Sequence, residues 1–97
     1  NTGRIDIQIG IGYSSDIPKA KKLLEQVINS EKGILKDKDI LVVVKSLDES
    51  CVTLETRAWV NTADYWNVRF NLLERYKNIF DENGIEIPFN QLDVHMK

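Results

Sequence analysis

Hydrophobic and polar residues alternate strictly from Arg4 to Tyr13. Isoleucines occupy every second position on one face of this segment, while the other face carries charged and polar residues together with two glycines. A period of two is typical of a β-strand with one buried face. The first element is therefore predicted to be a half-buried strand.

The hydrophobic period then lengthens to that of a helix. Ser15 or Asp16 offers an N-cap oxygen, and Pro18 suits the first turn, where its missing N–H needs no partner. The apolar positions that follow are Ala20, Leu23, Leu24, Val27 and Ile28. This spacing predicts an amphipathic helix, with Gly33 ending it or starting the loop after it.

Two further strands are predicted in the middle of the chain. Residues 40–47 are β-branched and apolar on both faces, and residues 52–60 alternate. The connection Asp48–Ser50 is too short for a parallel crossover. The two strands are therefore expected to form an antiparallel hairpin.

A long helix is predicted next, capped by Asn61 or Thr62 and running to about Asn83, with Gly84 as its stop. The apolar positions expected along it are Tyr65, Val68, Leu72, Leu73, Tyr76, Ile79 and Phe80.

A last strand is predicted from three alternating apolar residues, Ile85, Ile87 and Phe89, and Pro88 marks it as an edge strand. Leu92 and Val94 begin a further short extended piece. The order βαββαβ predicts one α+β domain over residues 1–97, a ferredoxin-like sandwich. Its antiparallel sheet is expected to have the order 4-1-3-2, with two helices on one face.

The composition narrows the function classes. Hydrophobic residues make up 42% and charged residues 29% of the 97 residues, and the net charge of −2 provides no basic surface for nucleic acid or anionic lipid. No apolar run approaches the roughly 18–20 residues that span a bilayer, and we expect no signal peptide in this segment. Because the chain opens on Asn1, we expect it to belong to a longer polypeptide.

The glycines at the end of the first strand pose a question, because a glycine-rich turn between a strand and a helix is typical of nucleotide-binding loops. Here Ser15 stands where a dinucleotide fingerprint needs its third glycine, and the predicted hairpin excludes the parallel strands that such a site requires. We expect Gly10 and Gly12 to give strand-end flexibility or to let another segment pack closely.

Other candidate chemistry is sparse. His95 lacks a second histidine for a metal site, Cys51 lacks an identifiable base, and Asp48 and Glu49 suit a solvated turn. We therefore predict no catalytic, cofactor-binding or metal-binding residues, no cofactor and no enzymatic activity.

An apolar edge is the strongest sign of a partner. An edge strand that is apolar on both faces needs cover; here Leu41 and Val43 point one way, and Ile40, Val42 and Val44 point the other. Trp59 projects from the sheet face that the helices should leave open, and Tyr65 and Trp66 start the long helix. We predict a candidate subunit interface formed by Leu41, Val43, Trp59, Tyr65 and Trp66. Local self-packing, including packing of Trp59 against the chain's own tail, is the alternative.

Several motifs together resemble one known family. They are IGIGYSSDI at residues 9–17, RAWV at 57–60, the aromatic pair Tyr65–Trp66, and GIEIPF at 84–89 followed by Gln91, Asp93 and Val94. These motifs resemble the cytoplasmic α/β domain of the small-conductance mechanosensitive channel (MscS) family over nearly the whole chain. The chain departs from the family pattern at Lys38–Asp39 and at Asn90, where the family often has proline.

The resemblance implies a function. Members are homo-oligomeric channels, typically heptamers, whose pore lies upstream in the cell inner or plasma membrane, and the α/β domains build a hollow cage on the cytoplasmic side. The channel releases ions and osmolytes on hypo-osmotic shock. This domain would meet the membrane only through upstream segments that the chain lacks, and alone it would conduct nothing.

An alternative function is a ferredoxin-like module that binds a small regulatory ligand, because a fold does not fix a function. RNA binding is disfavoured. The central strands expose one aromatic residue and no basic excess, whereas RNA recognition on this fold stacks bases on several aromatic residues.

Overall fold

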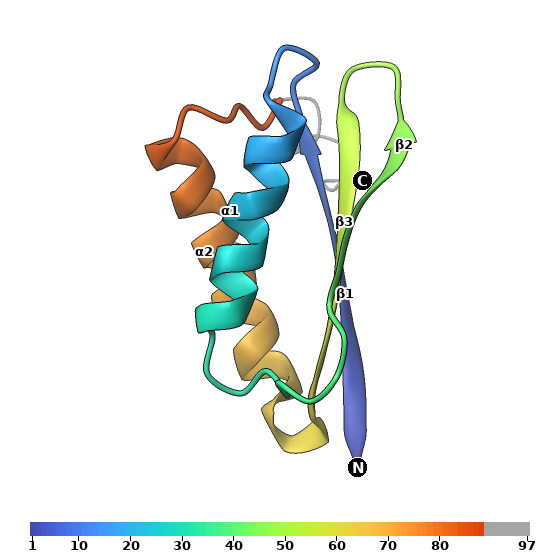
Figure 1. The fold of residues 1–97 in the computed structure, drawn as a ribbon, viewed down its shortest axis with the longest axis vertical. Helices are drawn as coiled ribbons and strands as arrows, with labels where there is room; N and C mark the ends of the chain where they lie inside the picture. The colour runs from blue at the N-terminus through green and yellow to red at the C-terminus, as the bar shows by residue number, and fades with distance from the viewer. Residues whose placement is uncertain (89–97) are drawn as a thin grey trace.

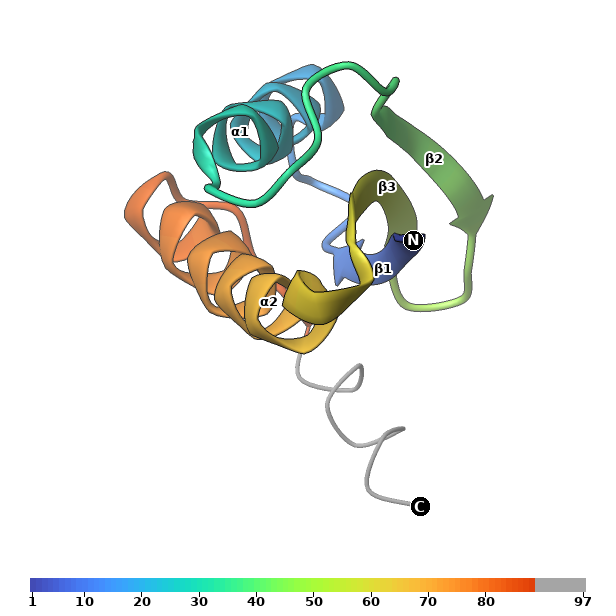
Figure 2. The same ribbon diagram turned by 90° about the horizontal axis from the view of Figure 1, so that it is seen from below.

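The computed structural model describes residues 1–88, which form two layers (Figure 1). Its elements in chain order are β1 (Thr2–Ile11), α1 (Ile17–Ser30), β2 (Leu41–Leu47), β3 (Val52–Asn61), the 3₁₀ helix η1 (Thr62–Asp64) and α2 (Tyr65–Glu82). Both helices lie on the same side of the sheet, as the view along the layers shows (Figure 2). The predicted α+β class and the two helices on one face are confirmed.

The sheet of the described residues has three antiparallel strands in the order β1-β3-β2. The predicted hairpin of β2 and β3 is present, with a register shift between Val44 and Ser46. Strand β3 pairs with β1 over its whole length, from Thr2 opposite Asn61 to Ile11 opposite Val52. This part of the predicted sheet order is confirmed.

The predicted fourth strand does not form over residues 85–88, so the order 4-1-3-2 is not confirmed. The amide of Thr62 donates a hydrogen bond to the carbonyl of Asn1, so the backbone groups of Asn1 point toward the β3 side. The backbone groups of successive residues along an antiparallel strand point alternately toward and away from the partner strand. The carbonyl of Asp6 and the amide of Gly12 therefore point away from β3. Arg69 of α2 donates a hydrogen bond to that Asp6 carbonyl at 3.0 Å. A side chain of α2 therefore occupies a backbone acceptor that a fourth strand would use.

The segment after α2 instead closes one end of the core. Its Ile85 is buried, and the amide of Gly12 donates to the carbonyl of Glu86 at 3.0 Å, just beyond the end of β1. A Cβ on Gly12 would approach the Glu86 carboxylate to 3.4 Å. This is an ordinary van der Waals distance, so the contact does not by itself require glycine at this position. Phe89, Leu92 and Val94 lie outside the described residues.

The ends of the helices follow local chemistry. The Asp16 carboxylate accepts a hydrogen bond from the Lys19 amide at 3.0 Å, and Pro18 lies in the first turn of α1, both as predicted. The second helix differs from the prediction, because the chain from Thr62 to Asp64 forms a 3₁₀ turn before the α-helix begins. Gly84 follows α2 with a φ of 73°, a left-handed conformation that glycine adopts without strain.

The core lies between the sheet and the helices. The inner face of the sheet supplies most of the isoleucines of β1 and the alternate residues of β3, and the helices contribute Leu24, Ile28, Leu72 and Phe80 among others. Leu73, one of the apolar positions expected along α2, is exposed and lies outside this core. Within residues 1–88, no helix combines the length and the apolar character required to cross a bilayer.

Candidate interaction surfaces

The five residues predicted as one interface lie on two separate parts of the molecule. Leu41, Val43 and Trp59 belong to β2 and β3 and lie on the outer face of the sheet. Tyr65 and Trp66 lie at the start of α2, in the other layer. Neither described helix covers the outer face of the sheet (Figure 2).

A shallow hollow opens on the outer face near the start of β2. Its volume is about 590 Å³, and it is lined by Ile40, Leu41 and Trp59 together with the charged residues Arg4, Asp39 and Arg57. Antiparallel pairing places Arg4 opposite Trp59 and Leu41 opposite Arg57, so these side chains share one face. We call this site the sheet hollow.

Trp59 is partly packed within its own chain. The Lys38 ammonium lies 5.6 Å from the centre of the indole ring, a cation–π distance, and the Leu35 amide donates to the Trp59 carbonyl at 2.8 Å. The loop before β2 therefore covers one side of this tryptophan. Some of the local packing that the sequence left open is thus present, and the Trp59 side chain remains half-buried.

Charged residues pair along the strands of the outer face. Arg4 binds Asp6 at 2.9 Å within β1, and Arg57 binds Glu55 at 2.7 Å within β3. The hydrogen bond and the charge of Glu55, with a further contribution from Asp6, raise the pKa of Arg57 above its ordinary value. Each of these two guanidinium groups is therefore oriented by a neighbouring carboxylate.

Helix α2 carries an exposed apolar stripe. Trp66, Phe70 and Leu73 are 62%, 59% and 42% exposed. The rings of Trp66 and Phe70 lie 5.8 Å apart between centroids. We call these three residues the α2 stripe. Tyr65 lies at its border: it packs against the core, and its ring meets that of Trp66 edge-on at 5.0 Å.

Phe70 was not among the apolar positions expected along α2 and Leu73 was, although both side chains are exposed. Trp66, Phe70 and Leu73 have helical spacing in the sequence. A second set of apolar residues on the same helix, Val68, Leu72 and Tyr76, also has helical spacing, and this set is the buried one. When a helix has two apolar stripes, its sequence does not show which stripe packs against the rest of the domain.

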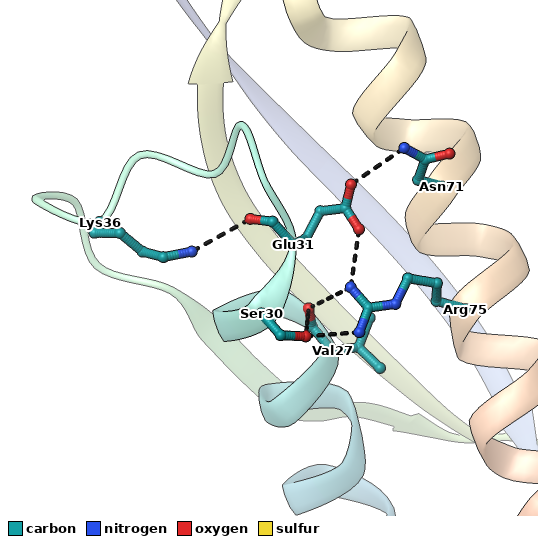
Figure 3. A network of polar contacts seen from close by, with 6 residues as sticks. All are labelled: Val27, Ser30, Glu31, Lys36, Asn71 and Arg75. Atoms are coloured by element: carbon teal, nitrogen blue, oxygen red, sulfur yellow. Dashed lines mark hydrogen bonds and ion pairs between the residues drawn. The ribbon is translucent and has the colours of Figure 1, made fainter.

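A polar network joins the two helices (Figure 3). Arg75 of α2 donates to the Glu31 carboxylate at 3.0 Å, to the Ser30 hydroxyl at 2.6 Å and to the Val27 carbonyl at 3.4 Å. Asn71 donates to the other Glu31 oxygen at 3.2 Å. Glu31 is buried at the C-terminal end of α1, so the network ties this end to the middle of α2.

One uncharged polar pair lies inside the core. The hydroxyls of Thr56 on β3 and Tyr76 on α2 are 2.9 Å apart, and both side chains are buried. Burial raises the pKa of Tyr76 to about 12, because the ionised phenolate would lose its hydration there; the hydrogen bond to Thr56 opposes this only partly. The pair joins the sheet to α2.

The residues weighed earlier as catalytic or metal-binding candidates make contacts that support the fold. Asp48 accepts hydrogen bonds from Ser46 and Thr53, which fixes the turn between β2 and β3. Cys51 is buried, with its sulfur 3.8 Å from the Thr53 hydroxyl. Residues 1–88 contain no group of three or more His, Cys, Asp or Glu placed to hold a metal ion. His95 lies outside the described residues.

The chain matches known proteins over nearly its full length. Residues 5–87 match the family model described as "Mechanosensitive ion channel MscS, C-terminal". The chain is 39% identical over 93 residues to a small-conductance mechanosensitive channel of Edwardsiella ictaluri, covering 96% of this chain and 32% of the relative. It is 38% identical over 95 residues to a small-conductance mechanosensitive channel of Helicobacter pylori, covering 97% of this chain and 35% of the relative.

A solved structure agrees. The crystal structure of Helicobacter pylori MscS in its closed state superposes with a TM-score of 0.86 and 36% identity, covering 91% of this chain and 35% of that chain. The chain thus spans about a third of the length of the relatives it matches. The family match and the superposition together place the chain in the MscS family of mechanosensitive ion channels, as its C-terminal domain.

Proposed function

We propose that this chain is the cage-forming cytoplasmic domain of a mechanosensitive channel that releases ions and small osmolytes on hypo-osmotic shock. The match of residues 5–87 to the C-terminal domain of MscS channels carries the proposal. The remaining two-thirds of a family member would supply the pore in the plasma membrane. The domain would then lie on the cytoplasmic side, and seven copies would form the cage that the sequence resemblance implies.

The exposed apolar residues support assembly. Trp66 and Phe70 are each more than half exposed on α2, and Leu41 borders a hollow on the opposite layer. Exposed apolar side chains on two faces of so small a domain are typical of contact sites. We therefore propose that Leu41, Val43, Trp59, Tyr65 and Trp66 belong to contacts between copies.

A structural role fits the chemistry of the domain better than catalysis or ligand binding. The relatives are named as channels, and none of the arginine–carboxylate pairs in residues 1–88 is accompanied by a nucleophile and base in hydrogen-bond contact. The alternative, a module that binds a small regulatory ligand, is not favoured by these matches.

The proposal can be tested in the full-length polypeptide that carries this domain. Expressed in cells without other mechanosensitive channels, it should protect them against hypo-osmotic shock, and membrane patches should show a current activated by tension. Absence of any tension-activated current would overturn the channel assignment.

The interface residues can be tested in the same polypeptide. The double variant Val43→Lys/Trp59→Ala and the single variant Trp66→Lys should each weaken the oligomer seen by size-exclusion chromatography. A matched control is Gln26→Lys on the exposed surface of α1, which should leave the oligomer intact. If both oligomer state and thermal stability stayed unchanged in the interface variants, the interface proposal would be wrong.

A further inference from the structure

We propose that the groove between the two helices binds a compact oxyanion, the carboxylate or phosphate group of a small solute, with Arg75 as its main ligand. The inference goes beyond the proposed function, because it requires neither a channel nor an oligomer. It adds a binding site to a domain whose main role is structural.

The site is a hollow of about 690 Å³ between α1 and α2, which we call the helix groove. One wall carries polar side chains of α1, and the other is formed by α2; the residues used below are Lys22, Glu25, Gln26, Asn29, Arg75 and Ile79. Lys22, Gln26 and Asn29 recur at helical spacing, so they lie on one flank of α1 and face the same solute.

Arg75 is held in place before any ligand arrives. Its Nη1 group donates to the Glu31 carboxylate and to the Val27 carbonyl, and its Nη2 group donates to the Ser30 hydroxyl (Figure 3). The Glu31 side chain is only 7% exposed, so this anchor is part of the packed domain. A group that is already fixed loses little conformational freedom on binding, which favours affinity.

One edge of the Arg75 guanidinium remains available. A guanidinium has five N–H donors in a planar fork, and the hydrogen bonds within residues 1–88 use two on Nη1 and one on Nη2. The Nε–H and the second Nη2–H lie side by side on the remaining edge. The side chain is 40% exposed, so a solute can reach this edge. Two oxygens of a carboxylate or phosphate match such an edge in a bidentate contact.

The charges of the helix groove favour a compact anion. Lys22 and Arg75 provide two positive charges against the single negative charge of Glu25. The amides of Gln26 and Asn29 can donate further hydrogen bonds. Glu82 lines a smaller adjoining hollow of about 240 Å³ that also includes Arg75. An extended polyanion would meet this carboxylate, whereas a small one would not.

A bound oxyanion would join the two helices. It would contact Lys22 on α1 and Arg75 on α2, beside the polar network that already ties the end of α1 to α2. A ligand that binds only the folded state stabilises it by mass action. The stability of the domain should therefore depend on the concentration of the anion.

The experiment is an NMR titration of the chain with inorganic phosphate and, separately, with succinate, at an ionic strength held constant with sodium chloride. The Nε–H signal of Arg75 and the side-chain amide signals of Gln26 and Asn29 should shift together. All three should saturate with one dissociation constant of about 1 mM, as expected of a small ligand at a partly exposed site.

Substitutions around the groove should move this dissociation constant in opposite directions. Lys22→Met should raise it about threefold, and Glu25→Gln should lower it by a similar factor. Arg75→Lys, which keeps the charge but loses the fork, should raise it about tenfold. The matched control is Lys21→Met, which removes the neighbouring lysine outside the groove and should leave the constant unchanged.

Thermal unfolding gives a second measurement. At ten times the dissociation constant, phosphate should raise the melting temperature of the native chain by about 5 °C more than that of Gln26→Glu, which adds a negative charge to the groove. The comparison between variants is needed because phosphate stabilises folded proteins in general. Without phosphate the two proteins should melt at the same temperature, since Gln26 is exposed.

The possible outcomes separate the proposal from its rivals. Shifts that saturate, weaken in Lys22→Met and strengthen in Glu25→Gln would support it. Shifts that rise without saturation, or that these variants leave unchanged, would show a general salt effect and overturn it. Sedimentation of the chain with phosphatidylglycerol vesicles, without a shift from either soluble probe, would point to a lipid headgroup and overturn the assignment to a small solute.

Discussion

The Glu31–Arg75 pair between the helices and the Glu55–Arg57 pair on the outer face of β3 have the same exposure. In each, the glutamate side chain is 7% exposed and the arginine side chain 40%. They differ in what they join. Arg75 reaches a residue 44 positions away on another element, whereas Arg57 binds its neighbour two positions away on the same strand.

The difference shows that exposure alone does not give the structural value of an ion pair. Arg75 also donates to Ser30 and the Val27 carbonyl, so its loss would leave several polar groups at the end of α1 without a partner. Arg57 makes its side-chain ion pair within a single strand, so its loss would separate no two elements. We expect the first pair to hold the fold and the second to shape a contact surface.

The Thr56–Tyr76 pair extends the comparison to the core, where neither partner is charged at neutral pH. It joins β3 to α2 as Arg75 joins α1 to α2, and both hydroxyls are satisfied by each other. Its stability contribution depends on pH in a way that the two ion pairs do not share.

The largest expected effect concerns this pair at high pH. The pKa of Tyr76 is raised to about 12 in the folded state from an ordinary value near 10, so the folded state holds its proton more tightly. The full contribution is present below pH 10 and is lost as the pH rises to 12, a decrease of about 2–3 kcal/mol in the free energy of unfolding.

Denaturant titrations of the native chain and of Tyr76→Phe across this range measure the effect, and their difference removes the titration of lysines common to both. Tyrosinate absorbance should show one phenol that ionises only near pH 12. Parallel stability curves for the two proteins above pH 10 would contradict the prediction.

The next effect is that of Arg75→Ala. Removing this guanidinium leaves the buried Glu31 carboxylate with Asn71 as its remaining partner and releases the end of α1 from α2. We expect a loss of about 2 kcal/mol in the free energy of unfolding, less than the full cost for a deeply buried pair because Arg75 is partly exposed. Urea unfolding followed by circular dichroism provides the measurement. A loss no larger than that of the surface variant Lys77→Ala would show that the network is dispensable.

A double-mutant cycle sharpens the same point. Glu31→Gln combined with Arg75→Met should give a coupling energy of about 1–2 kcal/mol, because each residue leaves the other without its main partner. The equivalent cycle of Glu55→Gln with Arg57→Met should give a smaller coupling. Equal coupling energies in the two cycles would mean that the sequence separation of the two partners does not affect the strength of the ion pair.

The smallest effect on folding is expected for Arg57→Ala. The substitution leaves the buried Glu55 carboxylate without its arginine but breaks no contact between elements, so the melting temperature should fall less than in Arg75→Ala. The oligomer should nevertheless weaken, because Arg57 lines the sheet hollow. Thermal unfolding and size-exclusion chromatography of the same samples test both statements. A large fall in melting temperature with an unchanged oligomer would show that the Glu55–Arg57 pair holds the fold rather than shaping a contact surface.

Much of the fold was predictable because local rules govern it. The alternation of β1, the Asp16 cap of α1 and the short turn at Asp48–Ser50 each depend on residues close together in the chain, and each is present. The family resemblance was likewise carried by short local motifs and agrees with the match over residues 5–87.

The candidate surfaces were only partly predictable. Trp59 was expected on the open face of the sheet and Trp66 at the start of the long helix, and both residues lie there. Phe70 and Leu73 could not be assigned to a surface until the position of α2 showed which of its two apolar stripes meets the sheet.

By itself the sequence determined β1, β2 and β3, both helices, the antiparallel hairpin and the family, because periodicity, caps and turn length act over a few residues. Only the tertiary structure decided that Arg69 would meet the outer edge of β1, that residues 85–88 would pass its end, and that Arg75 would find Glu31. These contacts join residues far apart in the chain, and their geometry depends on how the layers pack.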